Sequence, residues 1–176
     1  MSSPFSSATE LLTQYARLHR DRRNILVHAV GIPMVVFAFG VLLGRPRWDN
    51  GLSPAWVLWG LSALWYLTRG QPGPGLLAMA LNALLLALAA PLAASGTAAW
   101  LGAGVGALLL GWSAQLVGHY YEGRRADAVD DLTRLLVGPL FVAAEGLFAL
   151  GRCQALRAEI ERQAGPTHYR DLTVPA

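Results

Sequence analysis

The chain contains no lysine, a single cysteine and few charged residues, and each of these shortages argues against a class of protein. Charged side chains make up only 14% of the residues, whereas an ordinary soluble domain carries about a quarter. All fourteen basic residues are arginine, and they cluster at segment ends rather than in a stripe that would bind nucleic acid. Cys153 has no second cysteine with which to form a disulfide or a thiolate metal site. We therefore expect no nucleic-acid partner and no structural disulfide.

Apolar residues make up 54% of the chain, which predicts a small integral membrane protein of the all-α class. We expect one membrane domain over residues 1–176, built as a bundle of four transmembrane helices. An amphipathic helix should precede the bundle and interfacial helices should follow it. The four predicted spans are residues 25–43, 54–68, 75–94 and 98–117.

The segments that flank the spans are amphipathic. Residues 7–10 have the spacing of a capping box, which predicts an N-terminal helix that runs to about Arg23. Residues 131–150 have an uncharged core too short to cross a membrane, so we expect an interfacial helix that is broken near residues 138–139. A charged helix and a loose tail should then complete the chain over residues 151–176.

The arginines orient the spans by the positive-inside rule. With a cytoplasmic N-terminus, the outer loops receive only Arg45 and Arg47. The inner side then receives a larger group: Arg17, Arg20, Arg22, Arg23, Arg69, Arg124 and Arg125. We therefore expect an integral protein of a bacterial inner membrane with both termini in the cytoplasm. This topology brings the start of the first span and the end of the fourth span together at the cytoplasmic face.

Two polar stretches lie at those ends and hold three of the four histidines. In the first stretch, His19 lies on the apolar face of the predicted N-terminal helix, and Asn24 and His28 are four residues apart. The second places three polar residues on one helix face: Gln115, His119 and Glu122. Ionisable groups at membrane depth are costly to bury and therefore indicate function. Histidines beside a carboxylate suit iron, zinc or copper, so the stretches predict a metal site if they meet.

Other interpretations of the same residues stay open at this point. In a small transporter or channel, His28 and His119 would line a path for protons or metal ions. Such a path needs polar residues along the spans, and the spans contain few. A structural membrane protein would use the histidines only as hydrogen-bonding groups. The glycines of the fourth span permit close helix contact, as packing residues do in membranes. A homo-oligomer is a further open alternative.

The two stretches also resemble a known family. Tyr-x3-His-x4-Asn-x3-His-x2-Gly-x-Pro occurs here over residues 15–33, and Gln-x2-Gly-His with a following glutamate occurs over residues 115–122. A Pro-x-Phe-x3-Glu element follows at residues 139–145. Together they resemble the membrane 2-hydroxy fatty acid dioxygenase family over about residues 10–150.

This resemblance implies oxidation of 2-hydroxy fatty acids by O2 to acids one carbon shorter, with release of CO2 and with Fe(2+) as cofactor. It implies that the iron is held by His19, His28 and His119. Gln115 and Asn24 would orient the site, and Glu122 would bind the metal, hydrogen-bond a ligating imidazole or pair with a surface arginine; we favour the second role. Residues expected near the substrate are Tyr15, Arg22, Arg23, Arg124, Arg125 and Glu145.

The implied chemistry agrees with the composition. A 2-hydroxy acid can chelate iron through its hydroxyl and carboxylate, and its cleavage supplies the four electrons that O2 requires. No second reductant is needed, and the chain has no glycine-rich nucleotide-binding motif. The acyl chain should lie among the apolar helices, and membrane lipids should surround the bundle.

Overall fold

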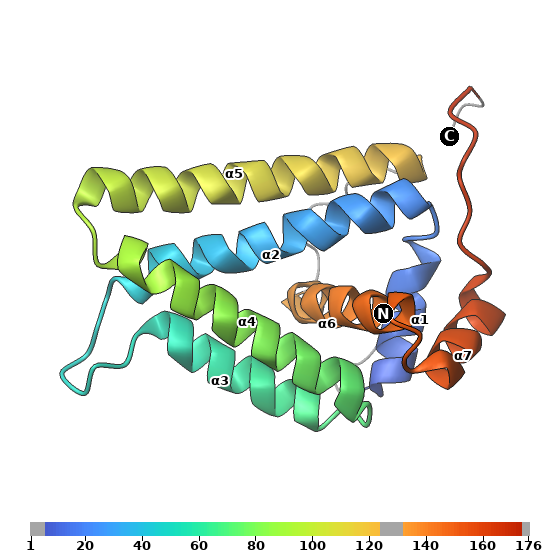
Figure 1. The fold of residues 1–176 in the computed structure, drawn as a ribbon, viewed down its shortest axis with the longest axis horizontal. Helices are drawn as coiled ribbons and strands as arrows, with labels where there is room; N and C mark the ends of the chain where they lie inside the picture. Colours follow the sequence, from blue (N-terminus) through green and yellow to red (C-terminus); the bar gives the residue numbers. More distant parts are fainter. Residues whose placement is uncertain (1–5, 124–131, 174–176) are drawn as a thin grey trace.

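The structure is a computed structural model that describes residues 6–123 and 132–173 (Figure 1). Within these residues every regular element is a helix. In chain order the helices are α1 (Ala8–Arg17), α2 (Arg22–Gly44), α3 (Pro54–Leu67), α4 (Pro72–Ala93), α5 (Thr97–Glu122), α6 (Leu132–Ala149) and α7 (Gln154–Ala164). The predicted all-α class is confirmed.

In the part of the chain that the structure describes, three helices, α2, α4 and α5, are each long and apolar enough to cross a membrane. The bent pair of α6 and α7 would be a fourth span if it crosses as one unit. α3 occupies the second predicted span, but its 14 residues rise only about 21 Å, less than a hydrocarbon core of about 30 Å. It nevertheless packs beside α4 and returns the chain toward the end from which α2 starts (Figure 1). The long helices therefore form a membrane bundle in which α3 is the short member.

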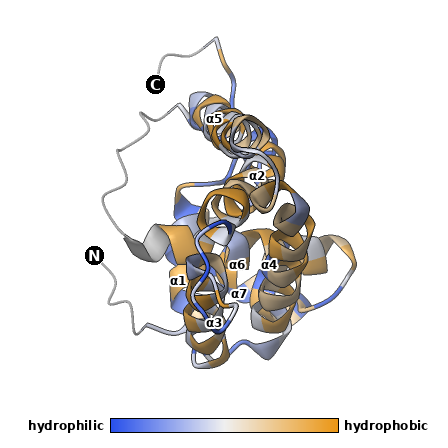
Figure 2. Ribbon diagram, turned by 90° about the vertical axis from the view of Figure 1, so that its left-hand side faces the viewer, coloured by the Kyte–Doolittle hydropathy of each residue, from blue (hydrophilic) through white to orange (hydrophobic). Residues whose placement is uncertain are grey.

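α2 lies between α5 and the remaining long helices (Figure 2). Gly31 of α2 and Gly111 of α5 face each other, and a Cβ added to either would lie 2.8 Å from the other's carbonyl oxygen. Small residues of this kind let helix backbones approach closely in membranes. Because His28 lies on α2 and His119 on α5, this contact controls how closely the two predicted motifs can approach.

The N-terminal helix ends earlier than the sequence predicted. It was expected to continue to about Arg23, but α1 ends at Arg17 and a second helix starts after Asp21. Asp21 caps α2 because its carboxylate accepts a hydrogen bond from the Arg23 N–H at 2.8 Å. The chain turns between the two helices, and His19 lies in this linker of residues 18–21.

α6 also differs from its prediction. Instead of breaking near residues 138–139, it continues as one helix through Pro139. A proline lacks an N–H and its ring crowds the carbonyl four residues earlier, but a helix can continue through it where neighbouring helices support the backbone. One such neighbour is α3, whose Tyr66 hydroxyl donates to the Leu136 carbonyl at 3.0 Å. The apolar face of α6 packs with α1 and α7 in a buried hydrophobic cluster, which includes Leu12, Leu140, Phe141, Phe148, Leu156 and Ile160.

The tail after α7 lies along the linker that carries His19. The His168 N–H donates to the Arg20 carbonyl at 3.0 Å, and the Arg22 N–H donates to the His168 carbonyl at 2.9 Å. These bonds form an isolated parallel bridge between Asp21 and His168. The tail expected to be loose is therefore attached to the bundle at this point.

Candidate metal centre

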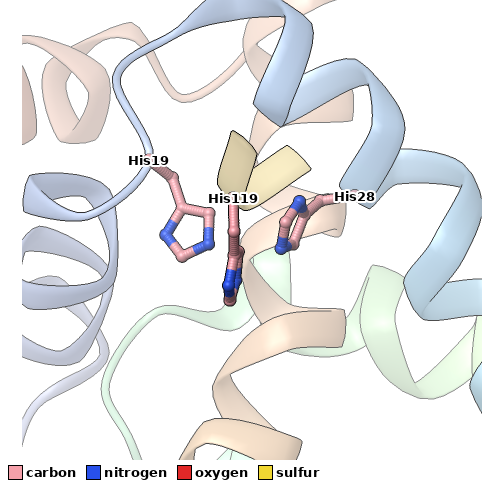
Figure 3. A group of neighbouring side chains, drawn as sticks. All are labelled: His19, His28 and His119. Carbon is pink, nitrogen blue, oxygen red and sulfur yellow. The ribbon is translucent and has the colours of Figure 1, made fainter. Parts of the chain in front are cut away.

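Three histidines from three segments meet at one end of the bundle (Figure 3). His19 comes from the linker, His28 from α2 and His119 from the last turn of α5. One ring nitrogen of each lies within 4.8 Å of those of the other two. Nitrogens that share one metal at roughly 2.1 Å can be at most about 4.2 Å apart. Shifts of less than about an ångström would therefore let all three rings bind one ion.

Backbone carbonyls orient two of the rings. Nδ1 of His19 lies 2.8 Å from the Tyr15 carbonyl oxygen, and Nδ1 of His28 lies 3.0 Å from the Asn24 carbonyl oxygen. Since a carbonyl only accepts hydrogen bonds, Nδ1 must carry the proton in both rings. Nε2 is then left with its lone pair, which is the usual arrangement of a histidine ligand held by an outer hydrogen bond.

His19 is suited to bind a cation through this nitrogen. Its side chain is only 6% exposed, and its Nε2 is buried without a hydrogen-bond partner among the described residues. A buried polar atom left unsatisfied costs roughly 1–3 kcal/mol, which a bound metal would offset. Burial and the nearby His28 lower the pKa of His19 to about 3, so the ring is neutral, as a ligand must be.

Glu122 holds the start of α2. Its Oε1 accepts a hydrogen bond from the Arg20 N–H at 2.8 Å, and its Oε2 accepts from the Asp21 N–H at 3.1 Å and the Asn24 side-chain amide at 2.9 Å. Backbone N–H groups at a helix start favour a carboxylate. Among the described residues, the metal-sized cluster consists of histidines alone. The contacts therefore support a positioning role for Glu122, which ties α5 to the segment between His19 and His28.

Replacing Glu122 with glutamine should weaken metal binding by roughly 10–100-fold without abolishing it. Glutamine keeps one acceptor oxygen but turns an NH2 group toward N–H donors, so the start of α2 loses part of its support. Metal affinity can be measured by competition with a chelator. The matched control is Glu159→Gln, because Glu159 pairs with Arg162 on the exposed face of α7. Complete loss of metal would make Glu122 a ligand, and unchanged affinity would show that its hydrogen bonds to the linker do not affect metal binding.

Asn24 connects Glu122 to His28. Its side chain is fully buried, and the side-chain amide donates a hydrogen bond to Glu122. Its backbone carbonyl orients the His28 ring. Gly118 of α5 lies against the same two residues. A Cβ at Gly118 would overlap Asn24 Oδ1 and lie 2.6 Å from His28 Nδ1. In sequence, Gly118 was only one element of a family motif, and its steric role emerges only in the folded chain.

Tyr15 and Gln115 make different contacts. The Tyr15 ring stacks on His19 with the centroids 4.1 Å apart and the planes 3° from parallel. Gln115 lies one turn before His119, and its Cγ would be 3.3 Å from a Cβ added to Gly31. Tyr15 therefore contacts a candidate ligand directly, whereas Gln115 packs at the α2–α5 contact.

The charged residues predicted near the substrate do not form a single group. Arg23 forms an ion pair with Asp21 at 2.7 Å. Arg22 and Glu145 instead line a cleft of about 410 Å³ bounded by α2, α6, α7 and the tail. Arg124 and Arg125 lie outside the described residues.

A larger apolar cleft lies farther along α2. Its volume is about 490 Å³, within the range of small-molecule sites. Its walls come from α2, α3, α4 and α6. The α2 residue of the lining that is nearest in sequence to His28 is Val36, about 12 Å farther along the helix. Tyr66 and Asn82 are polar residues on its lining. The cleft could not be located from sequence, because its walls come from four helices whose packing the pattern does not specify.

Comparison with known proteins identifies the relatives of this chain. A family described as 2-hydroxy-palmitic acid dioxygenase Mpo1-like matches residues 5–150, which include all three clustered histidines. The chain belongs to the Mpo1-like family. The resemblance inferred from the two motifs is thereby confirmed.

One relative in the Mpo1-like family is the 2-hydroxy-palmitic acid dioxygenase MPO1 of Saccharomyces cerevisiae. It is 32% identical over 149 residues, a match that covers 84% of this chain and 83% of the yeast protein. No solved structure matches the chain.

Proposed function

We propose that the protein is an iron-dependent dioxygenase that converts 2-hydroxy fatty acids into acids one carbon shorter and CO2. The observation that carries the proposal is the convergence of three histidines, from two distant motifs, in a member of the Mpo1-like family. The yeast relative is named as a dioxygenase of 2-hydroxy-palmitic acid, which suggests the substrate class.

His19, His28 and His119 would hold the Fe(2+). Imidazole ligands suit iron, and three protein ligands leave positions for other molecules. When bound, the ion would supply a site at which a 2-hydroxy acid and O2 come together. The chain's own contribution is orientation: the Tyr15 and Asn24 carbonyls hold two rings, and Glu122 holds the backbone between them.

The overall reaction balances without a further reductant. The bond between the carboxyl carbon and the hydroxyl-bearing carbon breaks, and the former becomes CO2. The hydroxyl-bearing carbon becomes the carboxyl carbon of the shortened acid. These two oxidations release four electrons, which O2 accepts. On balance, one oxygen atom is added to form the new carboxyl group and the other leaves as one water.

The substrate would lie with its polar end toward the start of α2 and its acyl chain in the 490 Å³ cleft. Arg22 is the better placed of the two described arginines for its carboxylate, because Arg23 is already paired with Asp21. Tyr15 and Glu145 would border the same region, with Arg124 and Arg125 as further candidates from the sequence.

Purified protein loaded with Fe(2+) should consume one O2 for each CO2 released from a long-chain 2-hydroxy acid. A short-chain 2-hydroxy acid should be used far less well, since each buried methylene contributes about 0.8 kcal/mol to binding. Oxygen uptake and chromatography of the product acids would measure both effects. Release of CO2 without O2 uptake, or equal use of short and long acids, would contradict the proposal.

We further propose that the histidine end of the bundle faces the cytoplasm of a bacterial inner membrane. The argument is the surplus of arginines in the segments that the predicted topology brings to that end of the bundle. Reporter fusions at the N-terminus and after Arg125 should both report the cytoplasm. A periplasmic signal from either one would reject this orientation.

A further inference from the structure

We propose that the tail segment, residues 165–170, positions His19 for metal binding by fixing the linker between α1 and α2. The inference rests on the proposed metal site but assigns it a component from another part of the chain. The Mpo1-like match ends at residue 150, so the tail segment lies outside the region that defines the family.

The tail segment bonds to the linker through its backbone. Besides the two hydrogen bonds of the His168 bridge, the Arg20 guanidinium donates to the Gly165 carbonyl at 2.6 Å. Arg20 is only 6% exposed, and its Nε also donates to the Ala16 carbonyl at 2.8 Å. The residue next to His19 is therefore held both to α1 and to the tail.

Asp21 makes a second attachment. Its carboxylate is fully buried, and Oδ2 accepts hydrogen bonds from the Arg170 N–H and the Arg23 guanidinium, each at 2.7 Å. The same Arg23 guanidinium donates to the Arg170 carbonyl at 2.7 Å. Asp21 thus caps α2 through one oxygen and holds the tail segment through the other.

The linker is consequently held from two sides. Glu122 of α5 accepts from the N–H groups of Arg20 and Asp21, while the tail segment bonds to the Arg20 carbonyl and the Asp21 carboxylate. His19 itself lies outside any helix, so its backbone lacks the support that α2 and α5 give the other two histidines. The tail segment compensates for this deficit and keeps Nε2 of His19 directed at the cluster.

The first test replaces Asp21 with asparagine in the full chain. Asparagine is as good an N-cap as aspartate, so α2 should still start correctly. Its NH2 group, however, cannot accept from the Arg170 N–H or the Arg23 guanidinium. We expect Co(2+) affinity, measured by visible absorption with a competing chelator, to fall by about 10-fold or more. The control is Asp171→Asn, where the lost charge is the same but the carboxylate, among the described residues, accepts hydrogen bonds from Thr173 alone; its affinity should be unchanged.

A second pair of variants tests the backbone bridge. His168→Pro removes the N–H that donates to Arg20, whereas His168→Ala keeps it and alters only an exposed side chain. The proline variant should bind Co(2+) about 10-fold more weakly, and the alanine variant should match the parent protein. Hydrogen exchange should also become faster over residues 18–25 in the proline variant alone.

The outcomes separate this inference from the metal site itself. If the parent protein binds Co(2+) and both Asp21→Asn and His168→Pro retain its affinity, the positioning role is wrong. If the parent protein binds no Co(2+), the proposed metal site is wrong. The attachment of the tail segment to the linker is then tested by hydrogen exchange alone. Unchanged exchange over residues 18–25 in both variants would overturn it.

Discussion

Replacing His28 with alanine should remove the metal and lower the oxidation of 2-hydroxy fatty acids by more than about 100-fold. The His28 ring packs against both other rings, with its centroid 4.7 Å from that of His19 and 5.5 Å from that of His119. Alanine leaves two imidazoles that are too few to retain iron against water and buffer. Metal content after gel filtration and O2 uptake would measure the two losses separately.

The control for this variant is His168→Ala, which removes an exposed imidazole outside the cluster. It should keep its metal and activity. A His28→Ala protein that folds and still binds metal with full affinity would show that the cluster is structural. In that case the buried rings would serve only to hydrogen-bond the Tyr15 and Asn24 carbonyls.

Replacing Gly118 with alanine should have the next largest effect. The added Cβ would overlap Asn24 Oδ1 and lie 2.6 Å from His28 Nδ1, so α5 must move away from α2 or the His28 ring must turn. Overpacking of this kind costs about 1–3 kcal/mol of stability. Since either movement separates His28 from His119, metal affinity should fall as well. Thermal unfolding in detergent and metal titration would report the two effects.

Gly106→Ala provides a matched control on the same helix. A Cβ at Gly106 meets no atom within 4 Å, so alanine should be tolerated, and its helix propensity is better than that of glycine by about 1 kcal/mol. If Gly118→Ala binds metal as well as Gly106→Ala does, the close contact of α2 with α5 is not what sets the geometry of the site.

The architecture was largely predictable because hydropathy acts locally. Runs of about twenty apolar residues identify membrane helices without any knowledge of their neighbours, and α2, α4 and α5 lie where those runs predicted them. The three histidines were also identifiable, since their spacing and the arginine bias placed them at the same end of the bundle. Composition and periodicity therefore determined the fold class and the residues to consider.

The contacts that orient those residues depended on tertiary structure. α1 ends at Arg17, and Asp21 caps the start of a separate helix, α2. Asp21 is itself hydrogen-bonded to the tail, about 150 residues later in the chain. Glu122 bonds to backbone N–H groups about 100 residues away, a contact to which no sequence pattern corresponds.

By itself, then, the sequence determined a helical membrane protein with three candidate ligands, because burial of apolar helices depends on local composition. Only the tertiary structure decided how Glu122, Gly118 and the tail segment act on those ligands. Hydrogen bonds and steric contacts are effective over a few ångströms, and the groups that make them come from helices that only packing brings together.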